Sequence, residues 1–152
     1  MNTEEYILKM DAETANVVSH ACELYARILM GQFQFIEHLT VKPIESGDPT
    51  FCERIDKCNE GLLQARKAAF PELGGWGHSY GVGHDRGADT AWHTYEALRH
   101  TIAWNEHPEG GITVDFDKPM RFSDAPMPEC EVAGEKVQRY CPYCGKAVKW
   151  DD

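Results

Sequence analysis

Two cysteines near the end of the chain have the spacing of a metal-binding knuckle. They are Cys141 and Cys144, in the run Cys-Pro-Tyr-Cys-Gly. A turn of this kind points backbone N–H groups at both sulfurs, which stabilises the two thiolates on one Zn²⁺ ion. A structural zinc takes four ligands, so two further groups have to come from elsewhere in the chain.

Cys130 offers a third thiol, because the sequence around it repeats the sequence around Cys141. Both stretches read Cys-x-x-x-Gly-x-x-Val, but Ala133 stands where the first copy would need a second cysteine. From residue 130 onward the chain therefore resembles a zinc ribbon, two knuckles on a short β-hairpin, with one of four ligands missing. The predicted zinc ligands are Cys130, Cys141 and Cys144.

The fourth zinc ligand stays open between a His, a carboxylate, Cys52 and water. If no group completes the site, the hairpin is a relic held by packing. Cys22 and Cys58 lie on apolar helix faces and are expected to be buried core thiols. Glutaredoxins use the same Cys-Pro-Tyr-Cys letters, but we expect no room for their fold in the eight residues after Cys144. A disulfide is disfavoured because the chain looks cytosolic.

A second group of chemically active side chains forms a column on an expected helix. Asp89, His93, Glu96 and His100 follow at i, i+4, i+7 and i+11, which places them on one face. Such a column could bind a metal and do acid–base work as a metal-dependent hydrolase, although His93 and His100 are separated by roughly 10 Å of rise. It could equally be a solvated polar face with Glu–His pairs.

A glycine-rich loop, residues 74–87, precedes this helix and contains six glycines. Glycine lets backbone approach a ligand closely, and the loop brings further His, Tyr and Arg side chains beside the helix start, where an anionic or nucleotide-like ligand could bind. The loop lacks the Lys-Ser/Thr ending of a phosphate-binding P-loop. The candidate ligand-binding residues are His78, Tyr80, His84, Arg86, His93, Glu96 and His100.

Hydrophobic periodicity predicts three helices as the frame for these groups. The first covers residues 11–39, with a bend allowed at Gly31, the second residues 50–70 and the third residues 88–106. On the second helix, an apolar stripe that includes Ile55 and Leu62 should be buried against the first helix.

After the third helix, alternating polar and apolar residues over 111–119 predict one short strand ended by Pro119. The expected fold is therefore mainly α: a three-helix core with one short strand and a C-terminal zinc-ribbon-like β-hairpin. The expected divisions are a helical domain over 1–122, a linker over 123–129 and a zinc-ribbon-like tail over 130–152.

Charge narrows the range of partners. Residues 1–133 carry 22 acidic and 11 basic side chains, and residues 134–152 carry three acidic and four basic ones. An acidic body repels phosphate backbones, so general nucleic-acid binding by the body is not expected. No run approaches the 18 apolar residues of a membrane span, and we expect a cytoplasmic protein. The sequence leaves the oligomeric state open.

Four segments, residues 24–33, 79–82, 95–99 and 114–119, resemble a family of small phage- and prophage-encoded proteins of unknown function. The resemblance covers most of residues 20–120 and brings no catalytic residues with it. It implies a phage accessory role, which includes sequestering a host molecule. We therefore expect a non-enzymatic binding protein for a partner protein or a small anionic ligand, with a metal-dependent hydrolase as the alternative.

Overall fold

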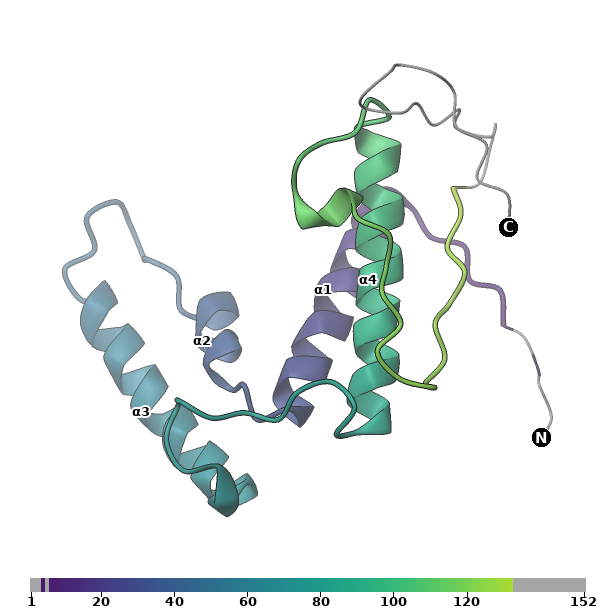
Figure 1. Cartoon of the computed structure of the whole chain (residues 1–152). Coiled ribbons are helices and arrows are strands. Elements are labelled where there is room, and N and C mark those ends of the chain that lie inside the picture. Colours follow the sequence, from purple (N-terminus) through teal and green to yellow (C-terminus); the bar gives the residue numbers. More distant parts are fainter. Residues whose placement is uncertain (1–3, 5, 133–152) are drawn as a thin grey trace.

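The computed structural model of the 152-residue chain describes residue 4 and residues 6–132. This part of the chain is mainly α-helical, and no strand occurs in it (Figure 1). Its elements, in chain order, are α1 (Ala12–Leu29), α2 (Gln34–Thr40), α3 (Phe51–Ala69), the 3₁₀ turn η1 (Pro71–Leu73), α4 (Arg86–Glu106) and the 3₁₀ turn η2 (Val114–Phe116).

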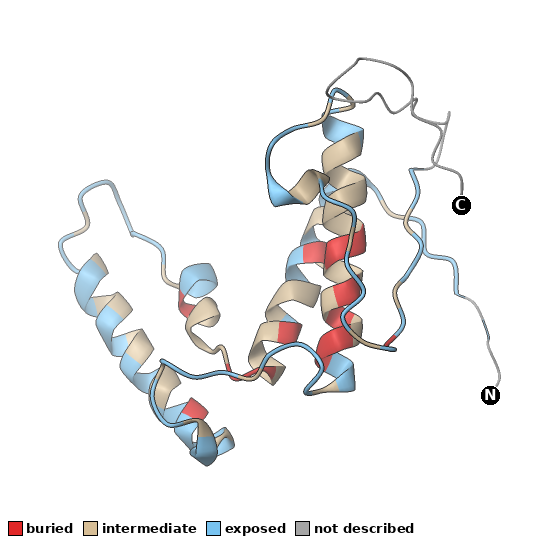
Figure 2. Cartoon of the chain, in the orientation of Figure 1, coloured by how far each residue is buried: buried red, intermediate tan, exposed pale blue. Residues whose placement is uncertain are grey.

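Helices α1 and α4 lie side by side and form the centre of the molecule, while α2 and α3 form an arm to one side (Figure 1). The buried residues of their contact are mostly small: Ala26, Met30, Ala88 and Ala91. Small side chains let two helix axes approach closely. Buried positions gather along this contact and along one side of α4 (Figure 2). The apolar core is thus small, and several of the buried residues beside it are polar or charged.

Gly31 ends α1 and starts the turn into α2. Its φ of +75° lies in the left-handed region, which glycine adopts without strain. The turn is closed by hydrogen bonds from Gly31 N to Ile28 O and from Gln32 N to Arg27 O. A Cβ at Gly31 would lie 2.7 Å from Leu73 Cδ1, so a side chain here would require Leu73 to shift as well as a strained backbone. The predicted single helix is therefore two helices, divided at the glycine where a bend was expected.

Arg66 holds the arm to the rest of the molecule. Its side chain is fully buried, and its guanidinium donates to four backbone carbonyls: Gly31 at 2.6 Å, Gly74 and Gly75 at 2.8 Å each, and His78. One cation therefore joins the end of α1, helix α3 and the glycine-rich loop. Carbonyls hydrogen-bonded to a buried charge are among the stronger contacts of a fold.

The loop between α2 and α3 is organised by Asp48. The Asp48 carboxylate accepts hydrogen bonds from Ile44 N–H, from the backbone and hydroxyl of Thr50, and from Arg54. The Ile44 N–H, followed by the other donors, holds the pKa of Asp48 well below its usual range. This ionised carboxylate fixes the start of α3 relative to the end of α2.

The prediction for the second helix holds for its bounds and less well for its packing. Helix α3 covers nearly the predicted segment, but Ile55 and Leu62 are half-buried. The helix packs on α2, which belongs to the predicted first helix, and on η1, while it does not pack on α1. The sequence also predicts Leu62 to be more buried than Glu96, whereas Glu96 is buried. The interpretation of the α4 column as a solvated polar face is therefore wrong.

The predicted strand over residues 111–119 is wrong, because η2 occupies its centre. Hydrogen bonds from Phe116 N to Thr113 O and from Asp117 N to Val114 O close a tight turn there. A strand needs a neighbour to pair its backbone, and the described part of the chain offers none.

We expect Arg66→Met to lower the free energy of unfolding by about 3–5 kcal/mol, because the substitution removes a buried guanidinium that donates to four backbone carbonyls. Lys67→Met at the neighbouring exposed position is the control and should change stability by less than about 0.5 kcal/mol. Urea denaturation of the two variants measures the difference. Equal effects would show that Arg66 does not hold the arm.

Candidate functional site

The seven residues predicted to bind a ligand lie in three separate places. The loop before α4 and the first residue of α4 hold four of them, the buried face of α4 holds two, and a cleft beside α4 holds one. These are, respectively, His78, Tyr80, His84 and Arg86; His93 and Glu96; and His100.

The polar column of α4 is a buried surface and not a solvated one. Asp89, His93 and Glu96 are 4%, 0% and 7% exposed. Asp89 Oδ1 accepts from the backbone N–H of Gly83 at 2.7 Å, and Glu96 Oε2 accepts from the N–H of Met120 at 3.2 Å. These carboxylates therefore satisfy backbone donors of the irregular segments before and after α4.

The side chain of His93 likewise binds backbone groups of the segment after α4. Its Nε2 accepts from the N–H of Phe122 at 3.1 Å, and its Nδ1 lies 3.3 Å from the carbonyl of Pro126. Because Nε2 accepts, the ring proton is on Nδ1 and is donated to that carbonyl. Ala125, fully buried, lies between these partners in sequence. Residues 123–129, expected to be a linker, thus lie against α4.

The last turns of α4 bind the backbone of η2 from one side. Side-chain N–H groups of Arg99, His100 and Trp104 donate to the carbonyls of Val114, Asp115 and Phe116, at 2.5, 3.3 and 3.2 Å respectively. Three successive carbonyls are thereby satisfied by one helix face. These contacts give the segment after α4 a partner without any sheet, which is the physical reason that the predicted strand does not form.

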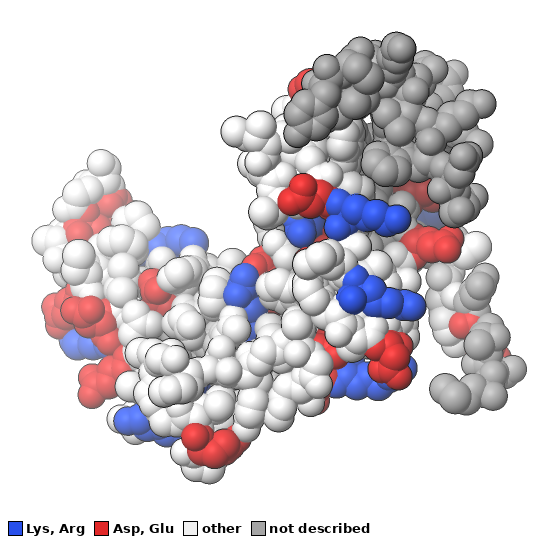
Figure 3. Space-filling view, viewed as in Figure 1, with Lys and Arg blue, Asp and Glu red and all other residues white. Residues whose placement is uncertain are grey.

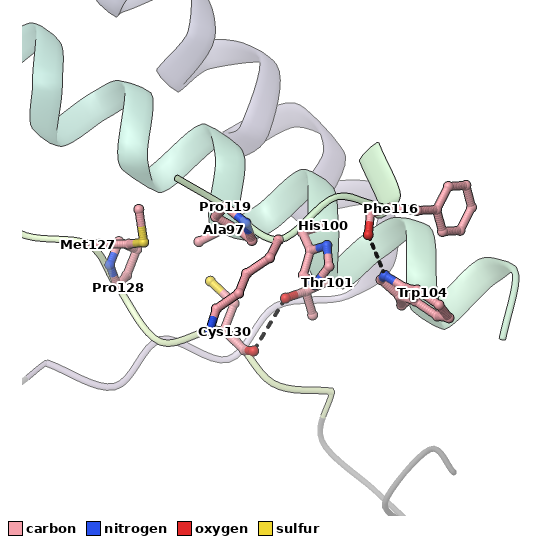
Figure 4. A pocket seen from close by; sticks show the side chains of 10 residues that line it. Ala97, His100, Thr101, Trp104, Phe116, Pro119, Met127, Pro128 and Cys130 are labelled. Atoms are coloured by element: carbon pink, nitrogen blue, oxygen red, sulfur yellow. Dashed lines mark hydrogen bonds between the residues drawn. The ribbon is translucent and has the colours of Figure 1, made fainter. Parts of the chain in front are cut away.

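A half-open cleft of about 310 Å³ lies between α4, residues 116–119 and residues 127–130 (Figure 4). Its walls are mainly apolar, with Trp104, Phe116 and Met127 among them. Its polar groups include His100 and Lys118. Apolar walls with a few polar groups are typical of binding clefts.

Cys130 is one of the residues that line this cleft. Its carbonyl accepts from the hydroxyl of Thr101 at 3.3 Å, and the burial of its side chain raises the pKa of the thiol. The other two predicted zinc ligands, Cys141 and Cys144, lie outside the described residues. Within the described residues, no three His, Cys, Asp or Glu side chains gather in a way that could hold a metal ion.

In the glycine-rich loop, Tyr80 and His84 stack with ring centroids 3.5 Å apart. The Tyr80 hydroxyl donates to the Glu72 carboxylate, and this hydrogen bond raises the pKa of Tyr80 and lowers that of Glu72. The Tyr80 N–H donates to the carbonyl of Met30. The aromatic pair is therefore tied to η1 and to the end of α1.

The start of α4 is already bound by the protein's own carboxylates. Asp85 Oδ1 accepts from the N–H of Ala88 at 2.8 Å as the N-cap, and Asp89 lies in the first turn. Arg86 pairs with Asp124 at 3.1 Å on the surface. Two carboxylates at a helix N-terminus occupy the place that an anionic ligand would take and repel it.

A second hollow, of about 250 Å³, lies between α1 and α2 and is called here the α1–α2 notch; its lining is His20, Glu23, Leu24, Arg27, Phe35, His38 and Leu39. Arg27 forms its base: the guanidinium pairs with Glu23 at 2.7 Å and lies 3.8 Å from the centre of the Phe35 ring. Leu39 is 53% exposed, and Val17, seven residues before Leu24 on α1, is 63% exposed. The notch is lined by apolar side chains together with two histidines and the Arg27–Glu23 ion pair.

The sequence interpretation missed three arginines that organise these sites: Arg27, Arg66 and Arg99. Their signal was weak, because an arginine on a helix is ordinarily a solvated charge. Arg66 and Arg99, however, each lie on a helix that leads into a long irregular segment containing glycine or proline. Such segments lack backbone partners of their own, and arginine offers five donors to supply them.

No protein-family model matches the chain, and neither a curated protein nor a solved structure does. Among the described residues, no helix combines the length and the apolar character needed to cross a membrane.

We expect His93→Leu to lower the free energy of unfolding by about 2–4 kcal/mol, because it removes a buried imidazole that binds the N–H of Phe122 and the carbonyl of Pro126. His78→Leu, at an exposed position of the glycine-rich loop, is the control and should have an effect near zero. Urea denaturation distinguishes the two. If the variants were equally stable, the buried polar column would not hold the segment after α4.

Proposed function

We propose that the protein is a non-enzymatic binding protein that recognises a partner protein through the α1–α2 notch. The observation that carries the proposal is the exposed Leu39 in the lining of this groove, together with the exposed Val17 two turns before the lining residue Leu24 on α1. Exposed apolar side chains that are surrounded by polar ones often mark sites of protein interaction. The resemblance to phage-encoded proteins makes a phage accessory role the biological setting that we favour.

The groove suits an amphipathic helix. Val17 and Leu24 are seven residues apart on α1, two turns on one face, and Leu39 faces the same hollow from α2. A helix with apolar residues at i, i+3 and i+7 places its side chains at matching intervals. The partner helix is expected to be basic, because residues 1–133 carry twice as many acidic as basic side chains. The described residues on the face in Figure 3 form no continuous basic patch.

The other functions considered have less support. A hydrolase built on Asp89, His93 and Glu96 would need lone pairs that these residues use for backbone N–H groups. A small anionic ligand at the glycine-rich loop would meet the carboxylates of Asp85 and Asp89.

The test uses a synthetic basic helical peptide with apolar residues at i, i+3 and i+7. Its binding to the full chain is measured by NMR. The peptide should shift the signals of α1 and α2 around the notch. Leu39→Glu should weaken its binding at least about tenfold, or about 1.4 kcal/mol. Ile112→Glu, at a fully exposed residue away from the notch, should leave binding unchanged.

Three results would contradict the proposal. An acidic peptide with the same apolar residues that bound as tightly would remove the charge argument. Peptide shifts in the cleft beside α4 would place the site elsewhere. Self-association of the protein that Leu39→Glu abolished, seen by sedimentation, would make a second copy the occupant of the notch.

A further inference from the structure

The cleft beside α4 has mostly apolar walls that come from three segments of the chain: α4, the segment that contains η2, and the segment that leads to Cys130 (Figure 4). The apolar side chains of its lining are Ala97, Trp104, Phe116, Pro119, Met127 and Pro128. The aromatic and proline side chains among them have few rotatable bonds, so a ligand that packs on them orders little that was free before. Such walls suit a flat apolar group.

Contacts of the fold itself hold these walls apart. Trp104 Nε1 donates to the carbonyl of Phe116 at 3.2 Å, and the two rings meet edge to face with centroids 5.4 Å apart. On the other side, the hydroxyl of Thr101 donates to the carbonyl of Cys130 at 3.3 Å. Both irregular segments are thus fastened to α4, and the cleft is formed before any ligand enters it.

Lys118 gives the cleft its charge. It is an exposed residue of the lining, and it forms no ion pair with any other described residue. No Asp or Glu lines the cleft among the described residues. The nearby Arg99, in contrast, already pairs with Asp115 at 3.2 Å and with Glu96 at 3.5 Å. A cation without a partner beside apolar walls favours a ligand that has an apolar body and a negative charge.

The lining favours a single negative charge over a phosphate. Phosphate sites commonly use arginines or the N-terminus of a helix, whereas this cleft has one lysine and lies along the C-terminal half of α4, where the helix dipole is negative. A carboxylate carries one charge and matches one lysine. The cleft volume of about 310 Å³ equals that of roughly ten water molecules, which admits a ligand of roughly ten to fifteen non-hydrogen atoms.

We propose that the cleft beside α4 binds a small aromatic monocarboxylate, whose ring packs on the apolar walls and whose carboxylate pairs with Lys118. This site shares no lining residue with the α1–α2 notch, so the inference does not rest on the proposed function. The acidic body repels anions in general, so binding requires the ring and the lysine together. For a ligand of this size we expect a Kd on the order of 0.1–1 mM.

The test is an NMR titration of the full chain with 2-naphthoate, and with 2-naphthamide as an uncharged ligand of the same shape. Naphthoate should shift the indole N–H of Trp104 and the amides of Thr101 and Lys118, and naphthamide should bind at least about threefold more weakly. Lys118→Met should reduce the affinity for naphthoate to that for naphthamide. Arg121→Met removes the same charge at an exposed residue outside the lining and should change neither affinity.

Four results would overturn the proposal. Naphthoate could leave the signals of the cleft unshifted, or naphthamide could bind as tightly as naphthoate. Lys118→Met could keep the full affinity for naphthoate. Inorganic phosphate could shift the same signals with equal affinity, which would show that charge alone is bound. Each result concerns the cleft beside α4 and leaves the basic-peptide test of the notch unaffected, so the two proposals fail separately.

Discussion

The fold depends on hydrogen bonds from the side chains of α4 to backbone that belongs to no helix. A mainly helical chain with long irregular segments has no sheet to pair their N–H and C=O groups, and leaving such groups buried without partners is costly. Asp89, His93 and Glu96 accept from three N–H groups, and residues 99–104 donate to a run of carbonyls. One helix thereby acts as the template for the segment after it.

This constraint explains where the hollows of the molecule lie. Because α4 holds residues 114–130 along its length, the chain reaches Cys130 beside His100 and leaves an apolar cleft between them. Arg66 has a similar role in the arm, where its guanidinium donates to backbone carbonyls of the glycine-rich loop and of Gly31. The apolar core between α1 and α4 is narrow by comparison, so polar contacts carry an unusual share of the architecture.

The helices were predictable from the sequence because periodicity reports which face of a helix is apolar. The second and third predicted helices match α3 and α4 within two residues at either end, and Gly31 was recognised as a weak point of the first. The predicted strand failed because alternation says nothing about whether a partner strand exists. Leu62 and Glu96 were misjudged for a related reason: burial depends on which segment covers a face.

The candidate site was less predictable than the fold. His93 and His100 look alike in sequence, yet His93 is fully buried with backbone contacts at both ring nitrogens, whereas His100 contacts the Asp115 carbonyl and lines a cleft. The distinction arises from residues about 20 to 30 positions further along the chain, which no local pattern reports. One signal was present: residues 119–130 hold three prolines and show neither helix nor strand periodicity, so their backbone groups need side-chain partners.

Hydrogen exchange of individual backbone amides tests the central claim most directly. The amides of Gly83, Met120 and Phe122 lie outside every helix, and each donates to a buried side chain of α4. If those side chains hold the irregular segments in place, the three amides should exchange nearly as slowly as the amides in the middle of α4. Exchange at the rate of an unstructured chain would contradict the account.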